Sequence, residues 1–312
     1  MDDLAVIIVS ANSADWLRPC LRSVFGHAGL AKLDVVIADN ESTDGAPELV
    51  EREFPKARVI RCRNLGFAYG NNRALMTCDA RYVLFLNPDT EILEGTFDDL
   101  VAALDERPDV GLVGVKQMTS DRRLYPTIRW FPNALRALGD GLGLERLPVR
   151  KRWMGERELA PELYDVELDC DWTTGSFMLV RREALEGAGF LDERFFMYAE
   201  ETDLCLRIRQ AGWAIRHLPQ MTILHHAHDE LSPKMEAQQA FARLQYANKH
   251  FSPLHRGAYG AALAFSYALR AVAADSETRR AASRRALRVI AGRAEPPFGR
   301  PPRYAVAPRK RL

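Results

Sequence analysis

A carboxylate, Asp89, stands where a buried strand is expected to end. The five residues from Tyr82 to Leu86 are apolar without interruption, which is typical of a strand buried on both faces of a parallel sheet. Pro88 cannot donate to a sheet and restricts Asn87, so the chain must leave the sheet there. Because ligands of open α/β sheets bind at the carboxyl ends of the strands, Asp89 is placed to meet a hard cation or a phosphate-bearing ligand. The same four residues, Asn-Pro-Asp-Thr, are also good turn chemistry on their own.

The segments around this carboxylate alternate between strands and helices. Apolar, β-branched runs predict strands at 4–9, 33–38, 57–62, 82–86 and 110–115. Helical spacing of apolar residues predicts helices at 15–25, 45–53, 70–77 and 96–107. This alternation is typical of βαβ units with right-handed crossovers. We therefore predict an α/β fold with a doubly wound, mostly parallel sheet that binds a nucleotide-sized ligand.

The second half of the chain is less regular. Residues 118–169 are interpreted as long loops and short helices, which often form a lid or an acceptor-site insertion. A strand is expected within 172–180, a helix at 202–211, and two short apolar segments at 214–218 and 222–224. Helices are expected at 233–250 and 257–274, followed by a Pro- and Arg-rich tail that we expect to be disordered. This organisation predicts a nucleotide-binding half at 1–117, an acceptor half at 118–230 and a C-terminal helical extension at 231–312.

Composition excludes several classes of function. The chain has 312 residues and a net charge of +1, so we expect no nucleic-acid partner. The start Met1-Asp2-Asp3 is unlike a secretory leader, and no apolar run reaches the ~20 residues of a membrane-spanning helix. The five cysteines lack metal-finger spacing, which favours free thiols and a cytoplasmic protein. No GxGxxG follows the first strand and no GxxxxGK[ST] occurs, so a dinucleotide cofactor and a P-loop are not expected.

A series of short polar motifs occurs in a fixed order along the chain. They are Ser10-Ala11-Asn12, the stretch 39–45, Asn64-Leu65-Gly66-Phe67, Asn87-Pro88-Asp89, Thr174-Gly175-Ser176-Phe177, Glu200-Glu201-Thr202-Asp203 and His225. Each motif is weak alone, but their order over residues 4–226 resembles that of the family 2 glycosyltransferases of the GT-A fold, in particular their rhamnosyltransferase-like branch. The resemblance implies an inverting enzyme that uses a nucleotide-sugar donor and Mn²⁺ or Mg²⁺.

The resemblance also implies a donor site. Asp39 would accept a hydrogen bond from the nucleotide base, whereas helix capping, the alternative, suits Asp44 better. Asn87 and Asp89 resemble the family's DxD motif with a neutral first position, so Asp89 would be the main metal ligand. His225 would be the second ligand, and an imidazole favours Mn²⁺ over Mg²⁺. The implied donor-binding residues are Ser10, Asn12, Asp39, Asn64, Gly66, Asn71, Asn87 and Asp89.

Glu201 is the general base that the resemblance implies. The family usually has aspartate at this position, so Glu201 is one methylene longer. The alternative is a carboxylate that only stabilises the first turn of a helix. Asp203 is a second catalytic candidate, although it can instead pair with Arg207 at i,i+4 and serve structure or acceptor orientation. The implied acceptor-binding residues are Trp172, Gly175, Ser176 and Glu200, with a core position as the alternative for Trp172. His226 and His228 are equally well explained as a polar loop.

The expected reaction moves a sugar from a dTDP- or UDP-sugar to a hydroxyl of a glycan or lipid-linked acceptor. The apolar segment 257–274, followed by arginines, would give peripheral contact with the inner face of the plasma membrane. Packing on the catalytic domain or on a second subunit of a homodimer are the alternatives. Two other functions remain open. A sugar-nucleotide nucleotidyltransferase would need a Gly-rich phosphate loop that this chain lacks after its first strand, and an inactive binding domain is suggested by Asn87 and Glu201.

Overall fold

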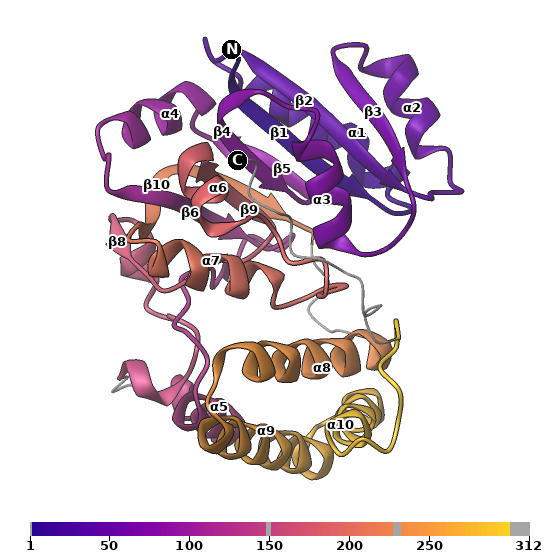
Figure 1. The fold of residues 1–312 in the computed structure, drawn as a ribbon, viewed down its shortest axis with the longest axis vertical. Coiled ribbons are helices and arrows are strands. Elements are labelled where there is room, and N and C mark those ends of the chain that lie inside the picture. The colour runs from indigo at the N-terminus through magenta and orange to yellow at the C-terminus, as the bar shows by residue number, and fades with distance from the viewer. Residues whose placement is uncertain (1, 148–150, 227–231, 300–312) are drawn as a thin grey trace.

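One mixed sheet organises the molecule, which is described by a computed structural model over residues 2–147, 151–226 and 232–299 (Figure 1). Its strands are β1 (Asp2–Ser10), β2 (Leu33–Asn40), β3 (Ala57–Cys62), β4 (Ala80–Leu86), β5 (Thr90–Glu94), β6 (Val110–Met118), β7 (Leu124–Tyr125), β8 (Leu168–Asp169), β9 (Phe177–Arg181) and β10 (Ala214–His225). The order is β3-β2-β1-β4-β9-β6-β10-β5, and the first four strands are parallel. Strand β9 of the second half lies antiparallel between β4 and β6, so both halves of the chain share one sheet.

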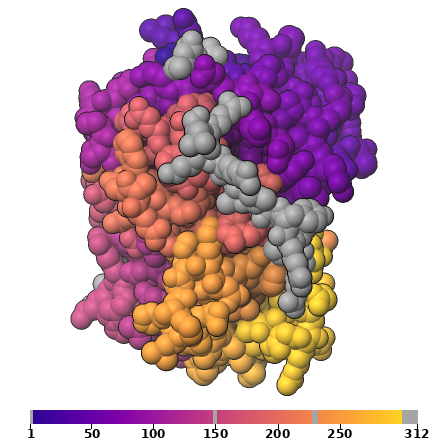
Figure 2. All heavy atoms as spheres, in the orientation of Figure 1, coloured from indigo at the N-terminus to yellow at the C-terminus, as the bar shows by residue number. Residues whose placement is uncertain are grey.

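Helices cover both faces of this sheet. They are α1 (Ala14–Gly26), α2 (Ala46–Glu53), α3 (Phe67–Leu75), α4 (Phe97–Asp105), α5 (Ala134–Leu142), α6 (Arg182–Ala188), α7 (Glu200–Gln210), α8 (Pro233–His250), α9 (Pro253–Ala273) and α10 (Glu277–Ile290), with short 3-10 helices η1 (Leu144–Arg146), η2 (Arg152–Met154) and η3 (Pro161–Tyr164). In Figure 1, α5, α8, α9 and α10 gather at the end of the molecule opposite β1–β3. The same division is visible on the surface in Figure 2, with the first residues in indigo and the last helices in orange and yellow.

The central strand has the burial that its sequence predicts. Leu84 and Leu86 of β4 point into the core on one face of the sheet, and Val83 and Phe85 point into the core on the other. Each of these side chains is almost completely buried. Because both faces of the strand are covered, polar and apolar residues cannot alternate along it. The strand is therefore an uninterrupted apolar run.

Strand β5 was not predicted, and it changes the geometry of the site. After the turn at Pro88 the chain re-enters the sheet at Thr90, antiparallel to β10. The predicted segments 214–218 and 222–224 are one strand, with a register shift between Leu218 and Thr222. In this register His225 lies opposite Thr90, next to Asp89. The short, half-polar β5 looks like a loop in sequence because it is stabilised by distant elements, through its pairing with β10 and the contact of Ile92 with Ser23 of α1.

The C-terminal helices pack on one another and on α5. Tyr259, Leu263 and Tyr267 of α9 are buried in a separate apolar cluster with residues of α5, α8 and α10. The packing alternative therefore explains the inner face of α9. Helix α10 was not predicted as an element of its own. Among the described residues, no helix is both long and apolar enough to cross a bilayer. Residues 227–231, which include His228, and the tail 300–312 lie outside the described residues.

Candidate active site

Two polar residues end adjacent parallel strands at one edge of the sheet. Ser10 closes β1 and pairs in register with Asp39 near the end of β2. Both are buried, and neither Ser10 Oγ nor Asp39 Oδ1 has a hydrogen-bond partner among the described residues. The second oxygen of Asp39 accepts from the Ser42 amide at 3.3 Å. Asp44, not Asp39, contacts the start of the following helix, where its Oδ1 accepts from the Ala46 amide at 3.2 Å, although Gly45 is the N-cap residue. Asp39 therefore keeps one oxygen available for a ligand.

The loops that follow these strands hold one another. Asn12 adopts a left-handed conformation, with φ of 56°, and its Oδ1 accepts from the Thr43 amide at 2.8 Å. A carboxylate oxygen of Glu41 accepts from the Asn64 amide at 3.0 Å. In this structure Asn12 connects two loops, and the backbone of Asn64 is fixed in the same way. Both residues lie at the expected edge of the sheet, where they shape the opening of the site more than its buried interior.

Gly66 allows a close approach between the donor side and the loop before α7. Its φ is +108°, and a Cβ added there would lie 2.3 Å from the carbonyl oxygen of Phe196. The Phe67 amide donates to the same carbonyl at 2.8 Å. Asn71 donates to the Phe67 carbonyl at 3.0 Å, and its Oδ1 has no partner among the described residues. Only glycine fits at position 66 because a side chain would push the two loops apart.

The turn that carries Asp89 is fixed on both sides. The Asn87 amide donates to the Ser176 carbonyl at 3.0 Å, and the Thr90 hydroxyl donates to the Asn87 carbonyl at 2.7 Å. The His226 amide donates to the Asp89 carbonyl at 2.8 Å. These contacts bring residues from β4, β9 and β10 together at one point. These hydrogen bonds fix the backbone of the turn, and none of them uses the side chain of Asp89.

Asp89 and His225, the two metal ligands that the family resemblance implied, lie next to each other. His225 Nε2 lies 3.5 Å from Asp89 Oδ1, and the ring of Tyr125 meets the imidazole edge-on at a centroid distance of 5.6 Å. Burial opposes the charged form of Asp89, but the hydrogen bond and charge of His225 outweigh it and lower the pKa of Asp89. The buried Nδ1 of His225 has no partner among the described residues.

This pair fits a divalent cation that is shared with a ligand. It supplies one carboxylate and one imidazole, a donor set that Mn²⁺ accepts. No cluster of three or more metal-ligating side chains occurs among the described residues. His226 is not available for this role. Its Nε2 lies 2.6 Å from Glu91, and its ring stacks on Trp16 at 4.8 Å.

Glu200 and Glu201 begin helix α7 after two strained residues. Tyr198 and Ala199 both have positive φ, 69° and 64°, which non-glycine residues seldom adopt. The Oε2 atoms of Glu200 and Glu201 are buried without partners among the described residues. Burial raises the pKa of Glu201 to about 7, although backbone amides and the charge of Arg129 limit the rise. Burial and the neighbouring Glu201 raise the pKa of Glu200 well above its usual range.

In the structure, only part of the segment expected to line the acceptor site faces the candidate base. A Cβ on Gly175 would lie 3.7 Å from Glu201 Cβ, so Gly175 does face the candidate base. The Ser176 hydroxyl is buried and donates to Gln117 at 2.8 Å. Trp172 is 8% exposed and its Nε1 donates to the Trp130 carbonyl at 3.1 Å. Ser176 therefore positions this segment. Trp172 is part of the core, as its alternative interpretation predicted, because its indole nitrogen is satisfied inside the protein.

Several buried polar atoms without partners lie at this edge of the sheet. In the described part of the chain they are Ser10 Oγ, Asp39 Oδ1, Asn40 Oδ1, Asn71 Oδ1, Glu200 Oε2, Glu201 Oε2 and His225 Nδ1, and others occur elsewhere in the fold. In folded proteins such atoms are nearly always paired. These atoms are therefore free to contact a polar ligand.

The sequence is similar to those of known proteins. The family model described as glycosyl transferase family 2 matches residues 5–187. A relative from Mycobacterium tuberculosis (strain ATCC 25618 / H37Rv), N-acetylglucosaminyl-diphospho-decaprenol L-rhamnosyltransferase, is 30% identical over 311 residues, which cover 94% of this chain and 99% of that protein. The chain belongs to glycosyl transferase family 2. Rhamnosyltransferase WbbL of Escherichia coli (strain K12) is 26% identical over 239 residues, covering 72% of this chain and 84% of that one. The predicted family and its rhamnosyltransferase-like branch are thus confirmed.

Solved glycosyltransferases share the fold. A mannosyltransferase from Pyrobaculum calidifontis, solved with GDP-Man and Mn²⁺, has a TM-score of 0.54 and 19% identity and covers 91% of this chain and 80% of that one. GalNAc-T7, solved with UDP, GalNAc and Mn²⁺, has a TM-score of 0.56 and 15% identity and covers 78% of this chain and 47% of that one. These similarities confirm the GT-A fold of this family 2 glycosyltransferase.

Asp203 of this glycosyltransferase faces away from the unpartnered carboxylates. It is completely buried, and its Oδ1 lies 2.6 Å from both Lys249 Nζ and His250 Nε2 of α8. Its Oδ2 accepts from Arg207 Nε at 2.9 Å. Burial opposes ionisation, but these cationic neighbours lower the pKa of Asp203. The predicted i,i+4 pair is present, and the geometry favours a structural role for Asp203 over a catalytic one.

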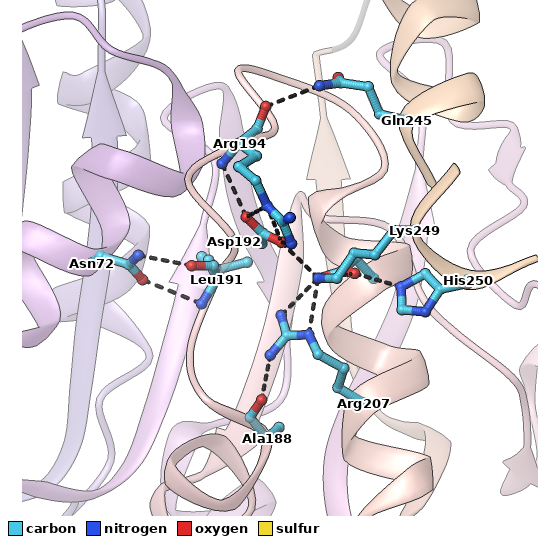
Figure 3. A network of polar contacts seen from close by, with 10 residues as sticks. Asn72, Ala188, Leu191, Asp192, Arg194, Arg207, Gln245, Lys249 and His250 are labelled. Carbon is cyan, nitrogen blue, oxygen red and sulfur yellow. Dashed lines mark hydrogen bonds and ion pairs between the residues drawn. The ribbon is translucent and has the colours of Figure 1, made fainter. Parts of the chain in front are cut away.

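The same network holds the loop that leads to α7. Lys249 also lies 2.6 Å from the buried Asp192, which binds Arg194 in turn (Figure 3). Gln245 donates to the Arg194 carbonyl at 3.1 Å. From the other side Asn72 of α3 donates to the Leu191 carbonyl at 2.9 Å. The loop between α6 and α7 is therefore anchored both by α3 and by the C-terminal helices.

Sequence reasoning did not identify three residues near the site. Tyr125 packs on His225, Glu41 fixes the Asn64 loop, and the charge of Arg129 acts on Glu201. Tyr125 and Arg129 lie in the irregular segment 118–169, where no periodic pattern indicates which side chains turn inward. Glu41 lies within the recognised 39–45 motif, and its acidic side chain was the available signal.

Proposed function

We propose that this family 2 glycosyltransferase transfers rhamnose from a nucleotide-diphosphate sugar, dTDP- or UDP-linked, to a hydroxyl of a lipid-linked acceptor with inversion. The observation that carries the proposal is the buried, unpartnered Oε2 of Glu201 at the same sheet edge as the Asp89–His225 pair. The rhamnosyl group and the lipid-linked acceptor are suggested by the mycobacterial relative, whose name states both.

Glu201 is the base in this proposal. Its raised pKa near neutrality suits a group that must be ionised before turnover and hold a proton afterwards. Glu201 removes the proton of the acceptor hydroxyl while that oxygen attacks C1 of the donor sugar. The bond from C1 to the nucleoside diphosphate breaks on the opposite face, so a single displacement inverts the anomeric centre. The transition state has oxocarbenium character, as in glycoside hydrolysis.

Asp89 and His225 hold Mn²⁺ or Mg²⁺ in this proposal. When bound, the cation neutralises the charge of the departing diphosphate. Asp39 and Ser10 offer their free oxygens to the nucleoside, and Asn71 and Asn87 orient the donor. These assignments are supported by the partnerless atoms of Ser10, Asp39 and Asn71 at the carboxyl ends of the strands.

Product analysis tests the proposal. The purified protein should transfer rhamnose from dTDP-rhamnose to a short-chain N-acetylglucosaminyl diphospholipid, and NMR of the product should show an inverted anomeric centre. Excess chelator should abolish transfer, and Mn²⁺ should restore it. Asp89→Ala should lose transfer and metal-dependent donor binding, because the diphosphate charge is no longer compensated. Full activity of Asp89→Ala, or of the native enzyme in chelator, would contradict the metal assignment.

The two other functions have different products. An inactive binding domain would bind a nucleotide sugar without hydrolysing or transferring it in the presence of Mn²⁺. A nucleotidyltransferase would release pyrophosphate from a nucleoside triphosphate and a sugar phosphate. Donor hydrolysis by the native protein, together with the absence of pyrophosphate release, separates the glycosyltransferase from both.

The outer face of α9 supports contact with the inner face of the plasma membrane. Leu254, Phe265 and Val272 are 81%, 49% and 80% exposed on this helix. Arg285 and Arg288 are exposed on the neighbouring α10, and each arginine contributes ~1 kcal/mol near an anionic surface. Flotation with anionic liposomes should recover the protein at low salt, and Phe265→Ser should reduce recovery. A concentration-dependent dimer that does not bind liposomes would assign this face to a second subunit instead.

A further inference from the structure

Arg129 is partly buried, unlike the exposed Arg122, Arg146 and Arg152 of its segment. Among the described residues its guanidinium has no ion pair or hydrogen bond, and its Nε is shielded from solvent. Of the other partly buried arginines there, Arg157 pairs with Glu145 and Arg136 donates to backbone carbonyls. The charge of Arg129 acts on Glu156 and Glu201, but neither carboxylate forms an ion pair with it in the described part of the chain. A partly buried guanidinium without a paired anion is costly, so Arg129 can still accept an anionic ligand.

The backbone fixes where this cation lies. The Arg129 amide donates to the Trp172 carbonyl at 3.1 Å, and the Trp172 amide donates back at 3.2 Å. The guanidinium carbon lies 5.5 Å from the centre of the Trp172 ring. Trp172 begins the segment that reaches Gly175, whose added Cβ would lie 3.7 Å from Glu201. The effect of Arg129 on the pKa of Glu201 agrees with this placement. Arg129 is thus held on the segment that reaches the candidate base, close enough for its charge to act on Glu201.

We propose that Arg129 forms a phosphate subsite, which binds a phosphoryl group of a substrate beside the hydroxyl that Glu201 deprotonates. This inference rests on the proposed role of Glu201. A guanidinium suits the task because its planar donors match phosphate oxygens in pairs. The phosphoryl group belongs either to a phosphate-bearing acceptor or to the diphosphate of the donor. The core-packed ring of Trp172 serves as a support that orients the guanidinium.

Paired acceptors test this subsite. The native enzyme, Arg129→Met and Arg129→Lys are compared with a short-chain N-acetylglucosaminyl diphospholipid and with octyl N-acetylglucosaminide, which lacks phosphate. Arg129→Met should raise KM for the phosphate-bearing acceptor by roughly 10- to 100-fold, the usual effect of losing a charged hydrogen bond. KM for the neutral acceptor and for the donor should not change. Arg129→Lys should recover part of the loss, because it keeps the charge but not the paired donors.

Arg209→Met is the matched control. It removes an arginine that is not part of the proposed site. This arginine lies 3.1 Å from Asp171, the residue that precedes Trp172 in the sequence. Both KM values should stay at the native level in this variant. A similar rise in KM in Arg209→Met and Arg129→Met would show that any lost charge in this region has the same effect, and the subsite would be rejected.

The remaining outcomes separate the sources of the phosphate and the failure of the proposed function. A rise in donor KM alone assigns the subsite to the donor diphosphate. A shifted pH profile with both KM values unchanged overturns the subsite, because Arg129 would then act only on Glu201. If the native enzyme uses neither acceptor, the proposed acceptor class is wrong, and the subsite is tested with inorganic pyrophosphate in chelator. Pyrophosphate should raise the Tm of the native protein more than that of Arg129→Met, and equal shifts would reject the subsite.

Discussion

The carboxylates on the two sides of helix α7 have pKa values that are shifted in opposite directions. Glu201 has a buried oxygen without a partner, and burial raises its pKa. Asp203, two residues later, is surrounded by Arg207, Lys249 and His250, and its pKa is lowered. Both residues are acidic and both fall in the first turn of the same helix. The difference shows that the elements packed on each side, and not the residue type, decide which carboxylate can exchange a proton.

The largest expected effect separates the two sides by activity. Glu201→Gln keeps the size and polarity of the side chain but cannot accept the proton, so transfer should fall by roughly 10²–10⁴. Donor binding, measured by isothermal titration, should change little, because the nucleotide and metal residues are untouched. A turnover near that of the native enzyme would mean that Glu201 only stabilises the start of the helix, at ~1 kcal/mol or less.

The complementary substitution should act on stability. Asp203→Asn removes the buried anion that Lys249, His250 and Arg207 share and leaves only Asp192 to pair with Lys249. Breaking such a network typically costs about 3–5 kcal/mol of unfolding free energy. Chemical denaturation measures this loss. The folded fraction should keep turnover within about tenfold of the native rate, because the network holds α7 without touching the reacting atoms. If Asp203→Asn abolishes turnover while Glu201→Gln does not, the base is Asp203.

The dependence on pH should separate activity from stability. Glu201 must be ionised to act, so kcat should fall about tenfold per pH unit below its pKa of about 7. The folded pKa of Asp203 is lowered, so its contribution to stability is complete above the unfolded value near 4 and is lost only as pH falls further. Between pH 7 and about 4, turnover should decline while Tm keeps this contribution. Parallel losses of kcat and Tm would contradict the comparison.

The smallest effect is expected from Glu201→Asp. This change restores the residue that the family usually has, and it keeps the carboxylate in the same pocket. Transfer should stay within about tenfold of the native rate, because only the reach of the side chain changes. A loss as large as that of Glu201→Gln would show that the longer side chain is required by the geometry of this site.

Local sequence was sufficient for the parallel strands of residues 1–117, but not for β5. The apolar run of β4, which ends at Leu86, and the alternation before it predicted the parallel strands, because burial on both faces leaves a pattern in consecutive residues. The pairing of Asp89 with His225 was also predicted, but from the family resemblance. Strand β5, which brings the two together, has no comparable pattern because its five residues depend on β10.

The acceptor half was less predictable, for physical reasons. Arg129 was not recognised because its position depends on backbone pairing with Trp172 across an irregular segment. The assignment of Trp172 to the acceptor site missed the carbonyl of Trp130 that satisfies its indole nitrogen. The surroundings of Asp203 depend on Lys249 and His250, which approach it only after α8 has packed. Such long-range contacts leave no local signal.

Because Lys249 bridges Asp192 and Asp203, the C-terminal helices of this enzyme cannot be exchanged independently of the rest of the chain. The family model ends at residue 187, before α7 begins. In this chain the helix that carries Glu201 is held by a lysine 2.6 Å from each of two buried aspartates, and that lysine belongs to the C-terminal helices. Exchanging these helices with those of a relative would therefore also exchange the support of the base. A chimera should keep its native unfolding free energy only if its new α8 supplies a cation at this position.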